Sequence, residues 1–331
     1  MKEQVSLAPN KRPRSAGNHR SRKRRPRRTL KRRIKRFKRR FKAKFASITS
    51  GGPVASIKKG VTYTILLTVC VLYLFPIYIV FTNSFKNRSE LYESIVSLPG
   101  SFSLEYYITA MEKMVFLSAL KNSLFVTLGS IVFIVALSSM TAWMLVRRTG
   151  KLSDSIFMIF VATMLIPFQT LMMPLMQEMG WIKNALRLPM TDTIGGLIYM
   201  YIGFGASLAV FLYHGFIKSI PKSLEEAAAI DGCTTFGIFW RIVFPILKPT
   251  TMTVIILDVI WIWNDYLLPS LTLTSKINRT IPLSTASFFG QFTIQWNLAM
   301  AGLTLTIIPV IIFYLCAQKY IIKGVAAGAV K

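Results

Sequence analysis

The chain has 331 residues, of which 53% are apolar, with a mean hydropathy of +0.48 and a formal net charge of +28. Such a mean hydropathy argues against a soluble globular domain and directs attention to segments near the ~20 residues needed to cross a bilayer. The two histidines, His19 and His214, and the widely separated Cys70, Cys233 and Cys316 argue against a metal centre or a disulfide framework. No GxxxxGK[ST] phosphate-binding loop occurs, so the sequence offers no nucleotide-hydrolysing site of that type.

Residues 1–59 form a strongly basic tail. They hold 23 of the 41 Lys and Arg residues and one acid, Glu3, which leaves 18 basic and 12 acidic residues in the remainder. Residues 1–28 are polar and are expected to be disordered. A cleaved signal peptide is not expected, because a long charged stretch precedes any apolar run.

A second part of the tail, residues 29–46, carries apolar residues at helical spacing, which predicts an amphipathic helix. The apolar stripe consists of Leu30, Ile34, Phe37, Phe41 and Phe45. A basic amphipathic helix is typical of binding to an anionic membrane surface. Contact with a nucleic acid or the ribosome, and a merely solvated tail, stay open as less favoured alternatives.

Six apolar segments follow the tail, and each predicts a membrane-spanning helix, because lipid cannot satisfy exposed backbone polar groups. They cover residues 61–82, 122–146, 156–176, 194–217, 250–270 and 300–320. The third is interrupted by Pro167 and the fourth by Gly203 and Gly205, so their ends are less sharply defined. The sequence therefore predicts an all-α integral membrane protein with six transmembrane helices.

The distribution of charge predicts the orientation of these spans. An even number of spans places both termini on one side, and the basic tail holds that side in the cytoplasm. The outer loops of this multi-pass cell-membrane protein would then be residues 83–121, 177–193 and 271–299. The first and last of them are long enough to form short surface helices. The expected organisation is a cytoplasmic tail (1–59), a first span with its outer loop (60–120), a core (121–322) containing a cytoplasmic loop (218–249), and a cytoplasmic C-terminus (323–331).

The cytoplasmic loop contains an unusual stretch, PKSLEEAAAIDGCTTFGIFWRIVFPILKP, from Pro221 to Pro249. Ser223 followed by Glu226 three residues later predicts a capping box at the start of a helix. Three alanines follow, and Gly232 permits the left-handed turn that ends a helix. A second helix is expected to begin near TTFG and to end near Pro245. A short helix with small residues and an acidic tip suits docking into a partner's groove, although an ordinary connector stays open.

The same stretch resembles the EAA loop of ABC importer permeases. The matching residues are Glu226–Ala228, Gly232 and the pair Ile242 and Pro245, with Phe244 where the family usually has Leu. Further matches to the carbohydrate (maltose/oligosaccharide-type) permeases are WNDYLLP in the fifth span, Phe75–Pro76 in the first, and the ending QKYIIKGVAAGAVK. The resemblance covers about residues 60–331 and leaves the basic tail outside it.

This resemblance implies a type I importer (MetI-like) permease core, the inner membrane component of a binding-protein-dependent transport system. Its expected partners are a second homologous permease, a dimer of ATPase subunits, an extracellular solute-binding protein and membrane lipid. The chain would hold no cofactor and would not be an enzyme, because the partner subunit uses the ATP. The implied ATPase-coupling residues are Glu225, Glu226, Ala227, Ala228, Gly232, Ile242 and Pro245. Glu225 could equally act only as a first-turn charge near the helix dipole.

Polar residues inside the fifth span predict either a solute path or hydrogen bonding between spans. A carboxylate at the bilayer centre costs ~2.5–3.5 kcal/mol, so it is expected to face protein or water. Asp258 and Asp265 are seven residues apart, which places them on one face of a continuous helix. The candidate solute-path residues are Asp258, Trp261, Trp263, Asn264 and Asp265. Asp265 could instead reach outer water or cap a loop.

Three other functions compete with an importer permease. A self-contained secondary carrier is disfavoured because six spans show no evident internal repeat. A membrane-anchored polyanion-binding protein would depend on the tail, and nucleic acid is not a favoured partner of the whole chain. An intramembrane enzyme would need a cluster of His, Cys or paired acids, for which only Asp258 and Asp265 are available.

Overall fold

The computed structural model describes residues 53–290 and 294–329. The basic tail with its predicted amphipathic helix at 29–46 therefore lies outside the described residues. Contacts divide the chain after Leu72 into two units. In the first unit, the described part is the beginning of helix α2 (Pro53–Asn83), and its side chains from Lys59 to Leu72 are all exposed.

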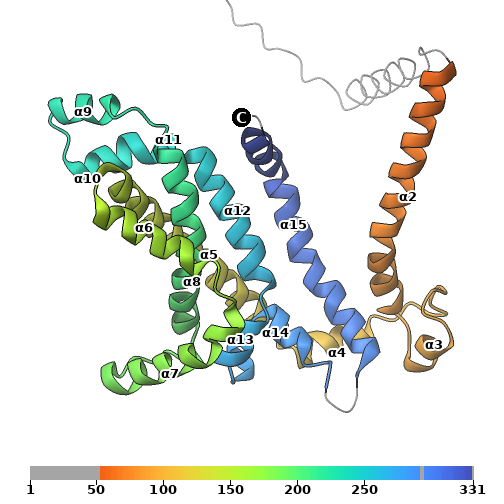
Figure 1. Ribbon diagram of the computed structural model, residues 1–331. Helices are drawn as coiled ribbons and strands as arrows, with labels where there is room; N and C mark the ends of the chain where they lie inside the picture. Colours follow the sequence, from red (N-terminus) through yellow and green to blue (C-terminus); the bar gives the residue numbers. More distant parts are fainter. Residues whose placement is uncertain (1–52, 291–293, 330–331) are drawn as a thin grey trace, which may run out of the picture. The chain divides into compact units, whose positions relative to one another are not determined.

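The second unit, which starts at Tyr73, contains the end of α2 and a series of helices (Figure 1). The longer ones are α5 (Phe116–Arg147), α6 (Lys151–Thr163), α7 (Phe168–Leu186), α8 (Ile194–Ile217), α12 (Lys248–Asn264) and α15 (Trp296–Ala329). The shorter ones are α3 (Arg88–Glu93), α4 (Glu105–Lys113), α9 (Ser223–Ile230), α10 (Thr235–Ile238), α11 (Phe244–Ile246), α13 (Leu267–Thr272) and α14 (Ile281–Ala286). A single antiparallel bridge, Phe289 to Ile294, is the only β-type pairing in the described ranges. The predicted all-helical class is confirmed.

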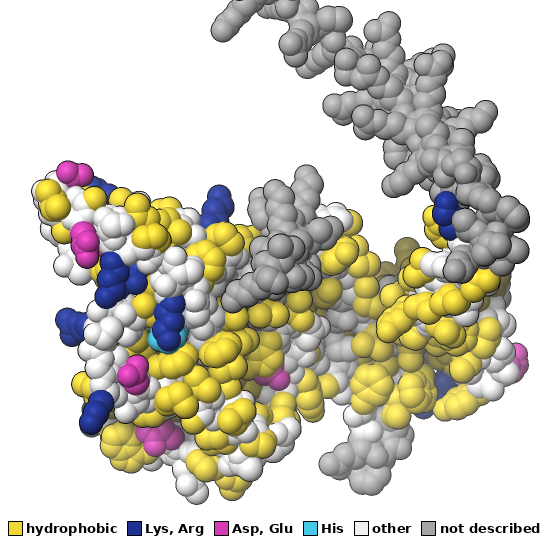
Figure 2. Space-filling view, turned by 45° about the horizontal axis from the view of Figure 1, so that its top comes forward, with side chains coloured by type: hydrophobic (Ala, Val, Ile, Leu, Met, Phe, Trp, Pro, Cys, Tyr) yellow, Lys and Arg dark blue, Asp and Glu magenta, His cyan; other side chains and the backbone are white. Residues whose placement is uncertain are grey.

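The core of this unit is built from α5, α8 and α12, which pack along one another. Small residues allow the close approach that helix packing in membranes requires. A Cβ at Gly205 of α8 would lie 2.5 Å from Cδ1 of Ile134 in α5. Tyr201 and Tyr213 of α8 are completely buried in the same core. Hydrophobic side chains cover much of the visible surface (Figure 2), which suits a protein surrounded by lipid.

Four helices are long and apolar enough to cross a membrane: Lys59–Asn83, Phe116–Arg147, Ile194–Ile217 and Trp296–Leu315. Two bent pairs bring the number to six if each pair is counted as one span. One pair is α6 and α7, bent by 108°, and the other joins Thr235–Ile246 to α12, bent by 76°. The predicted six spans thus correspond to four continuous helices and two bent pairs among the described residues.

The predicted third span, 156–176, is not one continuous helix. Helix α6 ends at Thr163, and α7 begins at Phe168 after Pro167, whose backbone is extended (φ −61°, ψ 134°). Proline cannot donate a backbone hydrogen bond and disfavours a helical residue before it, so the chain changes direction there.

The predicted fifth span, 250–270, also ends earlier than expected. Helix α12 stops at Asn264, because Asp265 adopts an extended backbone and accepts a hydrogen bond from the amide of Leu267 at 2.9 Å. Asp258 and Asp265 therefore do not share one continuous helix.

Two of the segments predicted to be outer loops contain short helices, as their lengths predict: α3 and α4 lie within 83–121, and α14 lies within 271–299. Asp192, two residues before the start of α8, connects the loop 177–193 to the loop 271–299. Its carboxylate accepts hydrogen bonds from the amides of Thr274 and Ser275 and from the hydroxyl of Ser275. The bonds to Ser275 lower the pKa of Asp192 to about 2, because they favour the charged carboxylate.

Candidate functional site

Helix α9 and the turn after it form the short helical element that the sequence predicts within residues 218–249. Gly232 has φ +83°, and its amide and that of Cys233 donate to the carbonyls of Ala229 and Ala228, both at 3.0 Å. This is the Schellman arrangement, in which a left-handed residue lets the chain satisfy the last helical carbonyls. The predicted turn at Gly232 is confirmed.

The predicted capping box at the other end of α9 was wrong. The N-cap position falls at Lys222, whose backbone is helical (φ −61°, ψ −29°) and whose side chain makes no capping bond. The amides of Glu225 and Glu226 instead donate to the carbonyl of Lys222 at 2.9 and 3.1 Å. Because the helical turn starts one residue earlier, Ser223 lies inside the helix rather than at the position from which a hydroxyl caps it.

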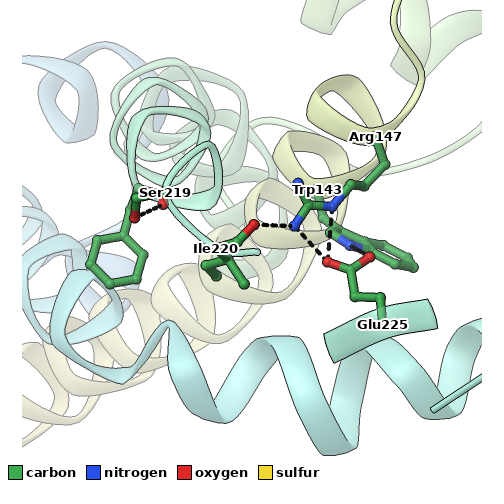
Figure 3. A network of polar contacts seen from close by, with 6 residues as sticks. Trp143, Arg147, Ser219, Ile220 and Glu225 are labelled. Atoms are coloured by element: carbon green, nitrogen blue, oxygen red, sulfur yellow. Dashed lines mark hydrogen bonds and ion pairs between the residues drawn. The ribbon is translucent and has the colours of Figure 1, made fainter. Parts of the chain in front are cut away.

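Glu225 of α9 is held against the end of α5 by a polar network (Figure 3). Its Oε1 accepts hydrogen bonds from Nε and Nη2 of Arg147 at 2.8 and 2.6 Å, and its Oε2 accepts one from Nε1 of Trp143 at 3.0 Å. Nη2 of Arg147 also donates to the carbonyl of Ile220 at 3.1 Å. The side chains of Arg147 and Glu225 are only 15% and 12% exposed. We call this group of four residues the Glu225 clasp.

Aromatic packing continues the clasp toward α12. The ring of Trp143 lies 5.3 Å from that of Phe239, which is 5.1 Å from Trp240, and Trp240 is 4.8 Å from Phe244. Phe239–Val243 form a π-helical turn in which the amide of Phe244 donates to the carbonyl of Phe239. Pro245 lacks an amide proton, so the regular α-helical bond at that position is lost and the wider turn is accommodated.

The predicted coupling residues divide into two groups by exposure. Glu226, Ala227, Gly232 and Pro245 are exposed, whereas Ala228 is buried in the core and Glu225 and Ile242 are half-buried. Large apolar neighbours on the exposed side are Ile230, 87% exposed, and Phe236, 65% exposed. The result is a largely apolar surface on and beside α9 (Figure 1), with two exposed carboxylates, Glu226 and Asp231.

Sequence reasoning missed Trp143 and Arg147. Nothing in the local sequence connects Arg147 to Glu225, which lies 78 positions away. The only available signal was a tryptophan and an arginine four residues apart at the end of a span, which places them on one helical face.

The candidate solute-path residues are divided among three environments. Asp258 and Trp261 line a cavity of about 660 Å³ between α8, α12 and the α6–α7 pair. Trp263 and Asn264 line a separate groove of about 450 Å³ formed by α5, α12 and α15. Asp265 accepts a hydrogen bond from the hydroxyl of Tyr201 at 2.9 Å. The solute path stays a prediction, and for Asp265 the geometry matches the alternative of hydrogen bonding between helices.

Several helices long and apolar enough to cross a membrane, with a short exposed helix bound to one of them, define a multi-pass membrane protein. Residues 134–327, more than half of the chain, match the family of binding-protein-dependent transport system inner membrane components. The chain belongs to this family.

Several relatives have names that specify a solute. A probable starch degradation products transport system permease protein, AmyC of Thermoanaerobacterium thermosulfurigenes, is 49% identical over 80% of this chain and 94% of its own length. The melibiose/raffinose/stachyose import permease protein MelC of Bacillus subtilis (strain 168) is 34% identical over 77% of this chain and 91% of its own. These relatives are transport permeases rather than enzymes.

The fold also matches a solved structure. A chain from the crystal structure of a bacterial ABC transporter involved in the import of the acidic polysaccharide alginate aligns with a TM-score of 0.68. The alignment covers 82% of this chain and 98% of that chain at 20% identity, so it shows a shared fold.

Proposed function

We propose that this chain is one of two permease subunits of an ATP-driven importer of oligosaccharides. Its partners are a second homologous permease, a pair of ATPase subunits that bind α9, and an extracellular solute-binding protein. Both termini face the cytoplasm, and the chain itself hydrolyses no nucleotide. The membership of the family and the transport roles named for AmyC and MelC support this proposal.

The observation that supports an ATPase contact is that one side of α9 is bound to α5 and the other side is exposed. One side is fixed to α5 by the Glu225 clasp, with three hydrogen bonds of 2.6–3.0 Å to one carboxylate. The opposite side leaves Glu226, Ala227 and Ile230 exposed. A partner that binds this exposed side would move α9 and α5 together, because a charge-assisted network is stiffer than a single chain connection.

The proposed solute class is a starch-derived oligosaccharide. The support is the 49% identity to a permease named for starch degradation products, with lower identity to one named for melibiose, raffinose and stachyose. Maltotriose is therefore the first probe to test.

In the test, the chain is co-expressed with the second permease, the ATPase and the binding protein that we propose as its partners. The purified complex is reconstituted in proteoliposomes. Ala227→Trp is expected to leave the melting temperature within about 2 °C of wild type, because the position is exposed. The same variant is expected to abolish both co-purification of the ATPase and uptake of labelled maltotriose. Thr149→Trp, an equally large addition in the exposed loop between α5 and α6, serves as the matched control.

Two results would contradict the proposal. Retention of the bound ATPase and of uptake by Ala227→Trp would remove α9 as the contact. Uptake by the wild-type chain alone, driven by an ion gradient without ATP, would instead indicate a secondary carrier.

A further inference from the structure

The cavity between α8, α12 and the α6–α7 pair is lined by a carboxylate, Asp258, whose hydrogen-bonding capacity the described residues leave partly unused. Asp258 is 3% exposed, and its Oδ2 is buried without a hydrogen-bond partner within the described part of the chain. A carboxylate inside a membrane span is costly unless it is paired or meets water or solute. It therefore has capacity to accept hydrogen bonds from something that the chain itself does not supply.

The wall of the cavity that α6 and α7 form contains a break in the helical backbone, which transporters often have near a binding site. Thr163, the last residue of α6, and Met164 both line the cavity at the point where the chain bends by 108°. Irregular backbone at membrane depth is tolerated where it borders protein or a polar cavity, and discontinuous helices commonly frame solute sites. The hydroxyl of Thr163 lies 2.8 Å from that of Ser207 on α8, which adds a second polar group to the wall.

The other residues that line the cavity suit a ligand whose ring has both polar and apolar faces. Trp261 and Tyr199 lie at its rim, 40% and 54% exposed, and present aromatic side chains. Gly203 also lines the cavity, and a Cβ there would meet nothing within 4 Å, so this wall is open. A volume of about 660 Å³ falls in the range of small-molecule sites, which combine a mostly apolar lining with a few polar groups.

We infer that the Asp258 cavity is a solute-binding subsite of this subunit, in which the carboxylate accepts hydrogen bonds from the hydroxyls of a neutral sugar while Trp261 packs on its ring. This inference rests on the proposed function and adds that the subunit contacts the solute itself. A metal ion is a poorer occupant, because the described residues contain no group of three or more His, Cys, Asp or Glu side chains that could hold one.

The experiment measures maltotriose uptake and ATP hydrolysis together in the reconstituted transporter with its binding protein. Asp258→Asn keeps the shape of the side chain and removes the charge. It is expected to lower uptake roughly tenfold or more, the effect of losing hydrogen bonds to a charged acceptor. ATP hydrolysis stimulated by the loaded binding protein should stay within about twofold of wild type, because the ATPase contact on α9 is untouched. The number of ATP molecules used per sugar should therefore rise about tenfold.

A matched tryptophan pair gives a second readout. Trp261→Leu removes the aromatic ring from the cavity, whereas Trp263→Leu removes one from the separate groove of α5, α12 and α15. The first is expected to raise the ATP used per sugar several-fold, and the second to leave it unchanged. This ratio does not depend on the amount of folded complex.

A purely structural role for Asp258 predicts a different pattern. Uptake and ATP hydrolysis would then fall in parallel, or the second permease would be lost on purification, and either result would overturn the inference. An unchanged ratio in both Asp258→Asn and Trp261→Leu would also overturn it while leaving the proposed importer intact. Failure of the wild-type complex to import maltotriose or any other oligosaccharide tested would overturn both.

Discussion

Two carboxylates, Glu225 on α9 and Asp258 on α12, differ in the hydrogen bonds that they accept. Glu225 accepts three hydrogen bonds from Arg147 and Trp143, whereas Oδ2 of Asp258 accepts none within the described part of the chain. A carboxylate that is fully paired stiffens the connection between two helices. One that is left unpaired inside a span keeps hydrogen-bonding capacity for a ligand. The comparison teaches that burial of an acid does not by itself indicate its role; its partners do.

The largest expected effect comes from breaking the Glu225 clasp. Arg147→Leu would leave a mostly buried carboxylate without its charged partner, at a cost of about 3 kcal/mol in the free energy of unfolding. Both the melting temperature and ATP-driven uptake should fall, as measured by thermal unfolding in detergent and by transport in proteoliposomes. Exchanging the charges, Arg147→Glu with Glu225→Arg, should restore part of the loss.

Arg148→Leu is the control for this prediction, since it removes a neighbouring positive charge that is not part of the Glu225 clasp. Equal destabilisation by the two leucine variants would mean that the charge of this segment matters rather than the contact with Glu225.

The next largest loss of stability is expected at Gly205, which packs against Ile134 close to Asp258. Gly205→Ala would place a Cβ 2.5 Å from the side chain of Ile134, and overpacking of this kind costs about 1–3 kcal/mol. Gly203→Ala, two residues away, should cost little, because a Cβ there meets nothing within 4 Å. The measurement is the melting temperature of each variant in detergent, which should be lower for Gly205→Ala than for Gly203→Ala. Equal melting temperatures would contradict the close packing of α8 against α5 at Gly205.

A smaller effect is expected at the turn after α9. Gly232→Ala forces a Cβ into a left-handed conformation (φ +83°), at a cost of about 1–2 kcal/mol. Since a Cβ at Gly232 would meet no other atom within 4 Å, the loss of stability comes from backbone strain alone. It should therefore affect α9 and not the helices packed around it. Hydrogen exchange of the α9 amides should become faster while that of α5 stays unchanged. Equal acceleration in both helices would indicate that α9 and α5 unfold as one unit.

The smallest expected effect is the pH dependence of stability that Asp192 contributes. Its pKa is lowered from 3.8 to about 2, so its contribution to stability is present above pH 4 and is lost as the pH falls toward 2. The difference in melting temperature between wild type and Asp192→Asn should therefore be constant from pH 7 to 5 and should shrink below pH 4. A difference that stays constant down to pH 3 would show that the hydrogen bonds to Thr274 and Ser275 do not favour the charged form.

Local patterns in the sequence determined the helical class, the approximate membrane segments and the turn at Gly232. Each depends on residues within a few positions of one another: an apolar run near 20 residues, or a glycine at the end of a helix. The same locality explains why the EAA-type residues could be placed on one short helix.

Only the tertiary structure decided which polar groups meet. Glu225 pairs with Arg147 from another helix, Asp265 accepts a hydrogen bond from Tyr201, and Oδ2 of Asp258 has no partner among the described residues. It also decided that the chain bends by 108° beside Pro167 and that α9 starts without a capping hydroxyl. These outcomes depend on where distant segments pack, because the position of a side chain in space is set by the whole core rather than by its neighbours in the chain.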